Sequence, residues 1–405
     1  MILPALLMAV VPAFAQLSLS DAEVRAVAQN VDVQIARGTV RQRAAALEIA
    51  RSGGIPHVTG NYALAPQAGP FDQNVVEQHM FTAAVGVTIN DIFAASAQSR
   101  SAASDLIAAQ RDAEAATLRA RENAVKLYFG ALQSIALERA RQEALEGAQR
   151  DRSVAGIRVR NGAAPRLDVV RADVSVAQAE SDLVRASADR ANAVDALASA
   201  TGSDPASFTA ERVPEQTQAP DAAPDEKRAV TRALAGRPEV ASLLAAIDAR
   251  GAGVDAARGA GWPTATASGG YSAGVDSGQS VHGPAANVTL DIPLAPAGNA
   301  RVSSALAELD VARAQLIDER RTVALEAAAA ARDVRADREA STASARALTE
   351  ALRAFGAVET GYREGASSSL DVADARRTLT QASIDALVAQ YREAQSEALL
   401  EIIAP

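Results

Sequence analysis

Few side chains in this sequence are placed where they could do catalytic or metal chemistry. The three histidines, His57, His79 and His282, have no carboxylate or second histidine at the spacing that metal ligands need. The chain has no cysteine, which excludes disulfides and thiolate metal sites, and no G-x-S-x-G nucleophile motif stands out. The residues therefore predict a protein that is not an enzyme, with no cofactor and no bound metal.

The most informative charged residues are carboxylates that follow two Gly-containing turns. Asp168 and Asp371 fall in the first turn of the helix expected after each reversal, where a carboxylate complements the helix dipole. Asp374 lies three residues beyond Asp371 and so shares a helix face with it. Helix-start chemistry is one explanation of Asp168 and Asp371, and a functional role is the other. Helix-start chemistry explains Asp374 less well because Asp374 lies further into the helix.

The elements that position these carboxylates come from a chain that repeats itself with a period near 200 residues. Leu167-Asp168-Val169 recurs as Leu370-Asp371-Val372, an offset of 203 (371 − 168), and Thr88-Ile89-Asn90 recurs as Thr289-Leu290-Asp291, an offset of 201 (289 − 88). Several landmarks in the same order at nearly one spacing indicate a tandem duplication.

The boundary between the repeats is a Pro- and Gln-containing stretch that is typical of a linker. We therefore expect a first repeat over residues 16–200, a linker over 201–225 and a second repeat over 226–405.

Both repeats predict the same order of elements. A helix of about 30 residues is followed by two strands, a very long helix, a short Gly-containing turn and a last helix of about 30 residues. Alanine is abundant and aromatics are only 3%, as expected for long helices that pack closely. Leu118, Val125 and Leu132 lie seven residues apart, which indicates a coiled-coil seam. The helices are expected over residues 18–51, 95–159 and 167–200, and over 225–258, 300–362 and 370–402.

The helix lengths are related. A helix of about 60 residues is about 90 Å long, and two helices of about 30 residues placed end to end cover the same distance. The last helix of one repeat and the first helix of the next are therefore expected to form one interrupted rod beside the long helix.

The four strands alternate between apolar and polar residues over about ten positions, which is the length a tilted strand needs to cross an outer membrane. A water-soluble sheet with one wet face gives the same alternation, but four such strands in a secreted chain favour the membrane. Four strands leave open edges, so closure needs several chains, and three chains would supply twelve strands. The loops over residues 65–80 and 272–284 are expected to face outside.

Residues 1–15 resemble a secretory signal peptide, with an apolar run and the cleavage site Ala13-Phe14-Ala15. No Lys or Arg precedes the apolar run, and a buried N-terminal helix is the alternative. The run is too short to span a bilayer, and no other apolar segment of spanning length follows. The net charge of −9 argues against nucleic acid as a partner.

At this point the chain resembles the TolC-like outer-membrane efflux protein family. The resemblance covers nearly all of the mature chain and rests on the duplication, on Pro56 and Pro263 before each first strand, and on the turns Asn161-Gly162 and Glu364-Gly365 with Leu-Asp-Val downstream. It implies a mainly α-helical protomer with a transmembrane β portion, assembled as a trimeric α-helical barrel topped by a 12-stranded β-barrel.

The resemblance also implies a function. The trimer would lie in the outer membrane of a Gram-negative cell, in contact with its lipid, with the helical tunnel in the periplasm. It would passively conduct solutes from a periplasmic adaptor and an inner-membrane pump to the exterior, or serve type I secretion. The short chain is similar to the compact heavy-metal and drug efflux branch of the family.

The two turns would form the periplasmic entrance of such a duct. The residues that match the family's gate are Asp371, Asp374, Tyr362 and Asp168, with Tyr362 expected to bond the neighbouring tip near Asp168. Asp371 and Asp374 of three chains would form an acidic ring that favours cations. The segment 367–369 carries serines where relatives have a basic residue, so a salt bridge through that residue is absent.

The turn residues themselves are the expected contacts with the adaptor, because glycine there allows a positive φ and close backbone approach. These residues are Arg160, Asn161, Gly162, Glu364, Gly365 and Ala366. A turn glycine without any partner is the plainer interpretation.

Two other classes of protein remain possible from the residues alone. A periplasmic or surface coiled-coil structural protein would explain the helices and the signal peptide, but not two hairpins of strands at matching places. A periplasmic adaptor would need further β domains around a single helical hairpin, whereas this chain has two equivalent halves.

Overall fold

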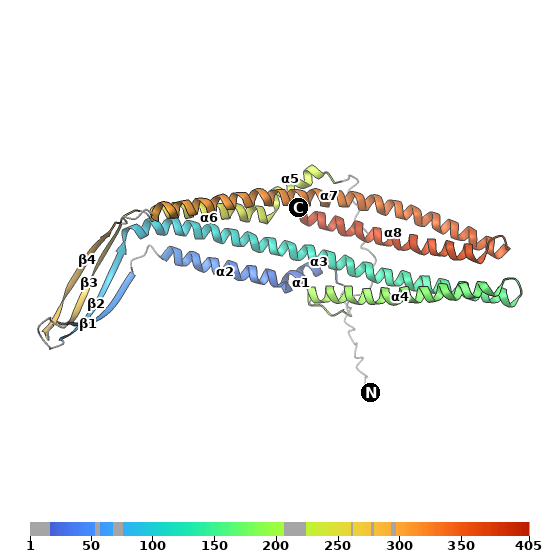
Figure 1. Cartoon of the computed structure of the whole chain (residues 1–405), viewed down its shortest axis with the longest axis horizontal. Helices are drawn as coiled ribbons and strands as arrows, with labels where there is room; N and C mark the ends of the chain where they lie inside the picture. Colours follow the sequence, from blue (N-terminus) through green and yellow to red (C-terminus); the bar gives the residue numbers. More distant parts are fainter. Residues whose placement is uncertain are drawn as a thin grey trace, which may run out of the picture. The chain divides into compact units, whose positions relative to one another are not determined.

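The computed structural model describes residues 17–52, 57–67, 76–205, 224–260, 262–276, 279–292 and 297–404. The predicted signal peptide and most of the predicted linker lie outside these residues. Figure 1 shows the order of the elements along the chain. They are α1 (Leu19–Gln29), α2 (Val31–Ser52), β1 (His57–Gln67), β2 (Val76–Thr88), α3 (Ile89–Arg160), α4 (Arg166–Thr201), α5 (Glu226–Gly236), α6 (Pro238–Gly259), β3 (Thr264–Asp276), β4 (Gln279–Asp291), α7 (Ala297–Glu364) and α8 (Ser369–Ile403).

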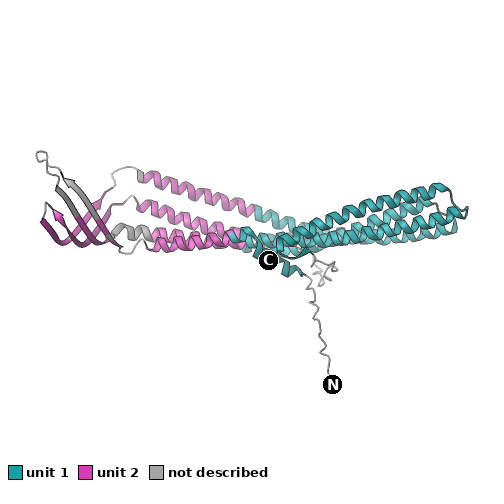
Figure 2. Ribbon diagram, turned by 90° about the horizontal axis from the view of Figure 1, so that it is seen from below, with its two compact units in different colours: residues 1–34, 116–237, 322–405 teal, residues 35–115, 238–321 magenta. Residues whose placement is uncertain are grey.

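The chain divides into two compact units, which are coloured separately in Figure 2. Unit 1 comprises residues 1–34, 116–237 and 322–405, and unit 2 comprises residues 35–115 and 238–321. Unit 1 holds two helical hairpins. We call residues 116–160 of α3 together with α4 hairpin 1, and residues 322–364 of α7 together with α8 hairpin 2. Unit 2 holds the sheet, and α3 and α7 contribute to both units.

The core of unit 1 confirms the predicted coiled-coil seam of the first long helix. Val125, Tyr128 and Leu132 are buried in one cluster that also includes Leu197 of α4 and Tyr391 of α8. Much of the remaining buried surface is alanine, which lets helix backbones approach closely. None of the helices in the described part of the chain is both long and apolar enough to cross a membrane.

The first helix of each repeat is not continuous, which corrects the prediction of single helices over 18–51 and 225–258. In the first repeat, Asn30 has an extended backbone, and its Oδ1 accepts a hydrogen bond from the N–H of Val33 at 3.1 Å, which caps α2. In the second repeat the break falls at Arg237, and Pro238 is the first residue of α6. Proline has no N–H and disfavours a helical conformation in the residue before it.

The expected rod between consecutive repeats is also wrong. The end of α4 meets α1 of its own repeat: Arg25 Nη1 donates to Ser203 Oγ at 3.1 Å, and Gly202, at φ 63°, lies against Gln29. In the second repeat, Glu226 of α5 and Glu397 of α8 pair with Arg332 and Arg338, less than two turns apart on α7. The first and last helices of one repeat therefore lie along the same long helix.

Unit 2 contains one antiparallel sheet of four strands in the order β1-β2-β3-β4. The strands are longer than predicted and reach well into the loops expected over 65–80 and 272–284. Pro284 lies opposite Tyr271 within β4, which has only β3 as a neighbour among the described residues. Proline is tolerated on such an edge strand because its missing N–H removes no ladder bond.

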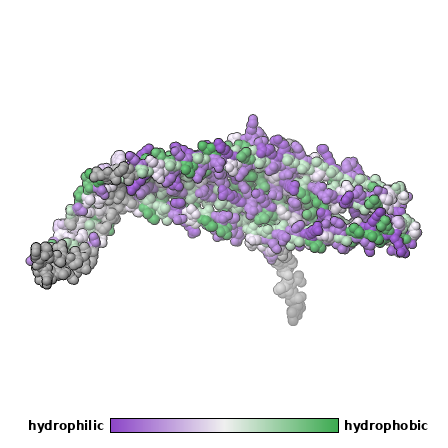
Figure 3. Space-filling view, viewed as in Figure 1, coloured by the Kyte–Doolittle hydropathy of each residue, from purple (hydrophilic) through white to green (hydrophobic). Residues whose placement is uncertain are grey.

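The register places the apolar positions of all four strands on one face of the sheet. Val58 pairs with Val85, Val85 with Gly269 and Gly269 with Ala286, so the apolar sets of all strands line up. Phe81, Val85, Tyr271 and Val288 on this face are exposed in the single chain. Over the helices, Figure 3 shows apolar and polar side chains interspersed on the visible surface.

Candidate functional site

The backbone adopts the same conformation at the tips of the two hairpins. Gly162 and Gly365 adopt positive φ angles of 71° and 83°. Behind each glycine, the N–H of the next residue reaches back five positions: Ala163 N donates to Arg158 O at 2.8 Å, and Ala366 N donates to Gly361 O at 2.7 Å. This arrangement closes the last helical turn and requires a residue that tolerates a positive φ. The predicted turns are thus confirmed.

The helices that leave the tips begin differently. The helix α4 follows Pro165, which makes no side-chain cap. The helix α8 follows Ser368, whose hydroxyl accepts from Asp371 N at 3.2 Å, while Asp371 Oδ2 accepts from the backbone N–H of Ser368 at 2.8 Å and from its hydroxyl at 2.7 Å. These hydrogen bonds from the Ser368 backbone and side chain lower the pKa of Asp371. Asp371 therefore does perform the predicted helix-start role.

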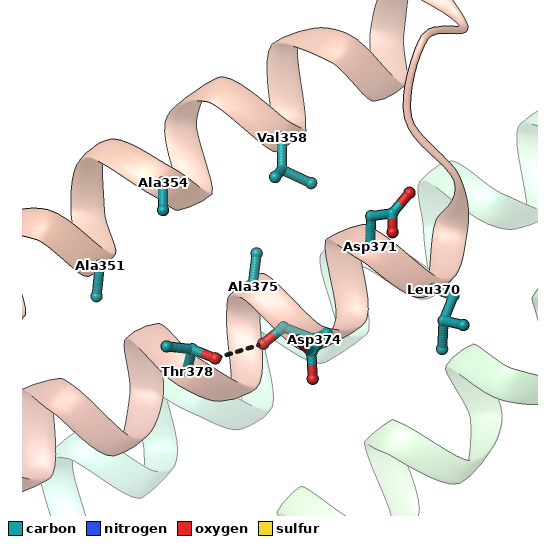
Figure 4. A pocket seen from close by; sticks show the side chains of 8 residues that line it. All are labelled: Ala351, Ala354, Val358, Leu370, Asp371, Asp374, Ala375 and Thr378. Atoms are coloured by element: carbon teal, nitrogen blue, oxygen red, sulfur yellow. Dashed lines mark hydrogen bonds between the residues drawn. The ribbon is translucent and has the colours of Figure 1, made fainter.

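Asp371 and Asp374 both line a groove of about 510 Å³ between α7 and α8 near the tip of hairpin 2 (Figure 4). Asp374 forms an ion pair with Arg377 at 2.6 Å, and both side chains are exposed. The Asp374 carbonyl accepts a hydrogen bond from Thr378 at 3.0 Å. The remaining lining residues are mainly small or apolar: Ala351, Ala354, Val358, Leu370 and Ala375.

Tyr362 connects hairpin 2 to hairpin 1, although through a residue that the sequence did not single out. Its backbone carbonyl accepts a hydrogen bond from Arg158 of α3, and the Arg158 guanidinium lies 4.1 Å from the centre of its ring. Tyr362 is buried, as is Asp168 at the start of α4. Within one chain, Arg158 is thus the partner that the structure gives to Tyr362.

A second connection between the hairpins lies deeper and was missed by the sequence reasoning. Both Nε and Nη2 of Arg376 in α8 donate to the carboxylate of Asp151 in α3, the latter at 2.8 Å. The same guanidinium stacks on Phe355 of α7, 4.5 Å from the ring centre. A Cβ on Gly147 would lie 2.6 Å from Arg376 Nη1, so the missing side chain of Gly147 makes room for the guanidinium. We call Asp151, Arg376, Phe355 and Gly147 the clamp.

Arg237, at the break between α5 and α6, was also missed. Its side chain is only 5% exposed and pairs with Glu122 of α3 at 3.1 Å and with Glu326 of α7 at 2.7 Å. The two glutamates lie on the two long helices, one on α3 and one on α7. The proline directly after Arg237 was the signal in the sequence that could have indicated the break between α5 and α6. In unit 1 this residue ties the end of α5 to both long helices.

Hairpin 1 leaves an apolar stripe uncovered. Leu167, Val170, Val174 and Val184 recur at helical spacing on α4 and are all exposed. The face of α4 that packs in the core carries other residues, among them Ala186, Val194 and Leu197.

Among the described residues, no group of three His, Cys, Asp or Glu side chains could hold a metal ion. His79 and His282 fall within the two ranges that were expected to be loops, 65–80 and 272–284, but they lie in the strands β2 and β4.

The family model for outer membrane efflux proteins matches this chain over residues 23–203 and 229–404. A comparison with curated protein sequences found no match.

The fold is similar to that of several solved structures. CusC, described with the conformational changes that accompany folding and transmembrane channel formation, aligns with a TM-score of 0.83 and 18% identity over 95% of this chain and 91% of its own. The CmeC outer membrane channel of Campylobacter jejuni gives 0.81 and 20% over 95% and 85%. The outer membrane protein VceC of Vibrio cholerae gives 0.81 and 18% over 95% and 96%.

Proposed function

Because the chain belongs to the outer membrane efflux protein family, we propose that it is the outer-membrane exit duct of a tripartite efflux system, a passive channel and not an enzyme. The observation that carries this proposal is the match of the family model to both repeats, over residues 23–203 and 229–404. The energy for transport would come from an inner-membrane pump, and the chain would supply only the path. Which solutes pass is set by the pump.

The duct requires several copies of the chain, and three is the number proposed. Two features of a single chain support assembly. The strands β1 and β4 each have one neighbour among the described residues, and open edges are not tolerated in hydrocarbon. The α4 stripe of Leu167, Val170, Val174 and Val184 is also left exposed, and a neighbouring copy would cover it.

The mass of the protein extracted from outer membranes in mild detergent tests this assembly. Light scattering should give a detergent-corrected mass close to three times that of the mature chain. A monomer or dimer recovered outside the outer-membrane fraction would overturn the proposal and favour a periplasmic coiled-coil protein.

We place the entrance of the duct at the hairpin tips. The hydrogen bonds from Ser368 lower the pKa of Asp371 and so favour its charged form, which means that its capping role does not prevent it from acting on ions. Asp374 lies beside it on the same groove. In a trimer these carboxylates would form a ring that favours cations. Tyr362 and Asp168, buried near the tips, belong to the same gate.

The double variant Asp371→Ala with Asp374→Ala should weaken cation preference. Reversal potentials in a planar bilayer under a salt gradient measure this directly. Asp195, an exposed aspartate far along α4, provides the matched control Asp195→Ala. Unchanged reversal potentials in the double variant would refute the carboxylate ring.

The adaptor would dock on the tips through Arg160, Asn161, Gly162, Glu364, Gly365 and Ala366. Both turn glycines have no atom within 4 Å of the place a Cβ would occupy, so the backbone there is open to a partner. A photoreactive amino acid at position 160 or 364 should cross-link to the adaptor in cells. The same group at the exposed position 333 of α7, far from the tips, should not. Equal cross-linking at all three positions would contradict docking at the tips.

A further inference from the structure

The tip of hairpin 1 carries the only Asn-Gly pair in the sequence, Asn161-Gly162. Both residues are exposed, as is Ala163 after them. The helix α3 ends at Arg160, and the chain reverses at Gly162 with a φ of 71°. The side-chain amide of Asn161 therefore belongs to a solvent-exposed turn between two helices.

The turn requires the glycine that follows Asn161, because a positive φ strains a residue that has a Cβ. No side chain therefore shields the backbone nitrogen of Gly162, and no atom lies within 4 Å of the place that a Cβ would occupy. Attack by this nitrogen on Cγ of Asn161 closes a five-membered ring. Intramolecular attack is favoured because the two reacting groups are already held together.

The hydrogen bond on this nitrogen is of a weak kind. The N–H of Gly162 donates to Val159 O at 3.1 Å, only three residues back and at a helix end. Asn123 in α3 and Asn192 in α4 are also exposed, but each lies inside a helix and is followed by alanine. These two asparagines have the same amide without the turn or the glycine, so they are internal comparisons.

The charge of the tip favours the same attack. Arg160 and Arg166 are exposed and form no ion pair within the part of the chain that the structure describes. Residues 158–171 contain four arginines and one aspartate, Asp168, which gives a net charge of +3 (4 − 1). Positive charge nearby favours loss of the proton from the attacking nitrogen and stabilises the oxyanion that forms on the Asn161 side chain.

We propose that Asn161 is a site of spontaneous deamidation, through which the tip of hairpin 1 gains a carboxylate with time. The Gly162 nitrogen gives its proton to water or hydroxide and bonds to Cγ of Asn161. The bond from Cγ to the side-chain nitrogen breaks, and that nitrogen takes up a proton and leaves as ammonia. Water then opens the succinimide at either carbonyl, which gives aspartate or isoaspartate. Water is the only reagent consumed, and no oxidant or reductant takes part.

The product gives hairpin 1 a charge that hairpin 2 already has. Glu364 occupies the equivalent place, 203 residues later (364 − 161), and is followed by Gly365 at a φ of 83°. Deamidation would therefore make the two tips more alike in charge. Its effect on the duct rests on the proposed function: each copy would add one negative charge at the entrance, which favours cations.

Peptide mass spectrometry of the purified full-length protein tests the site. The protein is kept folded in mildly alkaline buffer made with oxygen-18 water and is sampled over time. Asn161 should be converted many times faster than Asn123 and Asn192, with oxygen-18 incorporated and isoaspartate among the products. Asn161→Gln should remain almost unconverted, because the attack would have to close a six-membered ring.

The equivalent tip supplies a matched variant. Glu364→Asn places the same amide before Gly365 in the same turn, so position 364 should then be converted as well. Its conversion should be slower than that of Asn161, because Asp371 and Asp374 oppose the developing negative charge. Arg160→Gln with Arg166→Gln should likewise slow the conversion of Asn161.

The outcomes separate the deamidation from the duct. Conversion of Asn161 no faster than that of Asn123 and Asn192, or only after unfolding in denaturant, would overturn the site. In a planar bilayer, Asn161→Asp should increase cation preference relative to Asn161→Gln. Equal reversal potentials would overturn the effect on the entrance and leave the deamidation standing. A protein that forms no channel would refute the proposed function, and the mass measurement would still decide the site.

Discussion

Hairpins 1 and 2 have equivalent elements, but the polar contacts at equivalent positions differ: one lies within a hairpin and the other joins the two hairpins. In hairpin 1, Arg152 of α3 pairs with Asp173 of α4, within the hairpin. At the equivalent places of hairpin 2, 203 residues later (355 − 152 and 376 − 173), stand Phe355 and Arg376. With no carboxylate on its own hairpin at this level, Arg376 stacks on Phe355 and reaches across to Asp151 of hairpin 1.

The two ion pairs also differ in burial: the pair within hairpin 1 is more exposed than the pair between the hairpins. The side chains of Arg152 and Asp173 are 55% and 48% exposed, whereas those of Arg376 and Asp151 are 22% and 30% exposed. Equivalent positions of the two hairpins thus make an exposed contact within hairpin 1 and a more buried contact between hairpins 1 and 2. Exposed ion pairs contribute little to stability, and partly buried, bidentate ones contribute more. The clamp is therefore the better candidate for holding the hairpins together.

The largest expected effect comes from removing the clamp arginine. Arg376→Met leaves Asp151 without its partner and should destabilise unit 1 by about 1–3 kcal/mol, the cost of an unpaired, partly buried charged group. Arg152→Met, its counterpart in hairpin 1, should change stability far less, because both members of that pair are exposed. Thermal loss of helical circular dichroism in detergent measures both. Equal shifts would remove the distinction between the hairpins.

The turn glycines should show the two hairpins to be alike. Gly162→Ala and Gly365→Ala each force a side chain into a positive φ, at a cost of about 1–2 kcal/mol. The same thermal measurement should give similar losses for both variants. A loss at only one tip would mean that the equivalence of the two turns is superficial.

A smaller effect tests how closely the clamp is packed. Gly130→Ala in α3 meets no atom within 4 Å and should stabilise the helix by about 0.5–1 kcal/mol. Gly147→Ala gains the same helix propensity but displaces the Arg376 guanidinium, so it should be neutral or destabilising. In an Arg376→Met background the displacement is relieved, and Gly147→Ala should then stabilise. Stabilisation by Gly147→Ala in the wild-type protein would contradict the packing described.

The smallest effect concerns the different starts of α4 and α8. Asp371→Ala should speed backbone hydrogen exchange around residues 366–374, because the oxygen that accepts from Ser368 is lost, and leave residues 160–170 unchanged, since Pro165 makes no such cap. Exchange measured by mass spectrometry resolves the two tips. Faster exchange at both tips would show a global effect instead of a lost cap.

Lowering the pH should act in the same way. The folded pKa of Asp371 lies below its ordinary value, so the stabilisation is complete above the ordinary range and is lost as pH falls through the folded pKa. Protection at the tip of hairpin 2 should decrease there, after correction for intrinsic exchange rates.

The repeat structure, the long helices, the two turns and the shared face of the strands could be predicted because each rests on a periodic pattern. The seam of Val125, Tyr128 and Leu132 repeats along a helix, and Gly162 and Gly365 mark the reversals. The break at Asn30 could not be read as easily, since asparagine is only a mild helix breaker and acts there through a cap to Val33. Pro238 was a readable signal for the second break.

The contacts between the hairpins could not be predicted from the sequence. Arg376 and Asp151 are 225 residues apart, and many other exposed arginines and carboxylates have the same local pattern. Only packing decides that Gly147 leaves space and that Phe355 provides a surface for the guanidinium. The predicted gate residues Asp371 and Asp374 were correctly placed on one helix near the tip, but their local partners, Ser368 and Arg377, depend on side-chain geometry.

The most direct test of the duct and its entrance is single-channel conductance in a planar lipid bilayer. We expect the wild-type protein to conduct weakly, because the ties from Arg376 to Asp151 and from Arg158 to Tyr362 hold the two hairpins together. The double variant Arg376→Met with Arg158→Met should raise the conductance. The charge exchange Arg376→Asp with Asp151→Arg keeps an ion pair between the hairpins, so its conductance should be close to the wild-type value. Conductance unaffected by the double variant would contradict a closed entrance held by these ties, and absence of any conductance in all forms would contradict the duct itself.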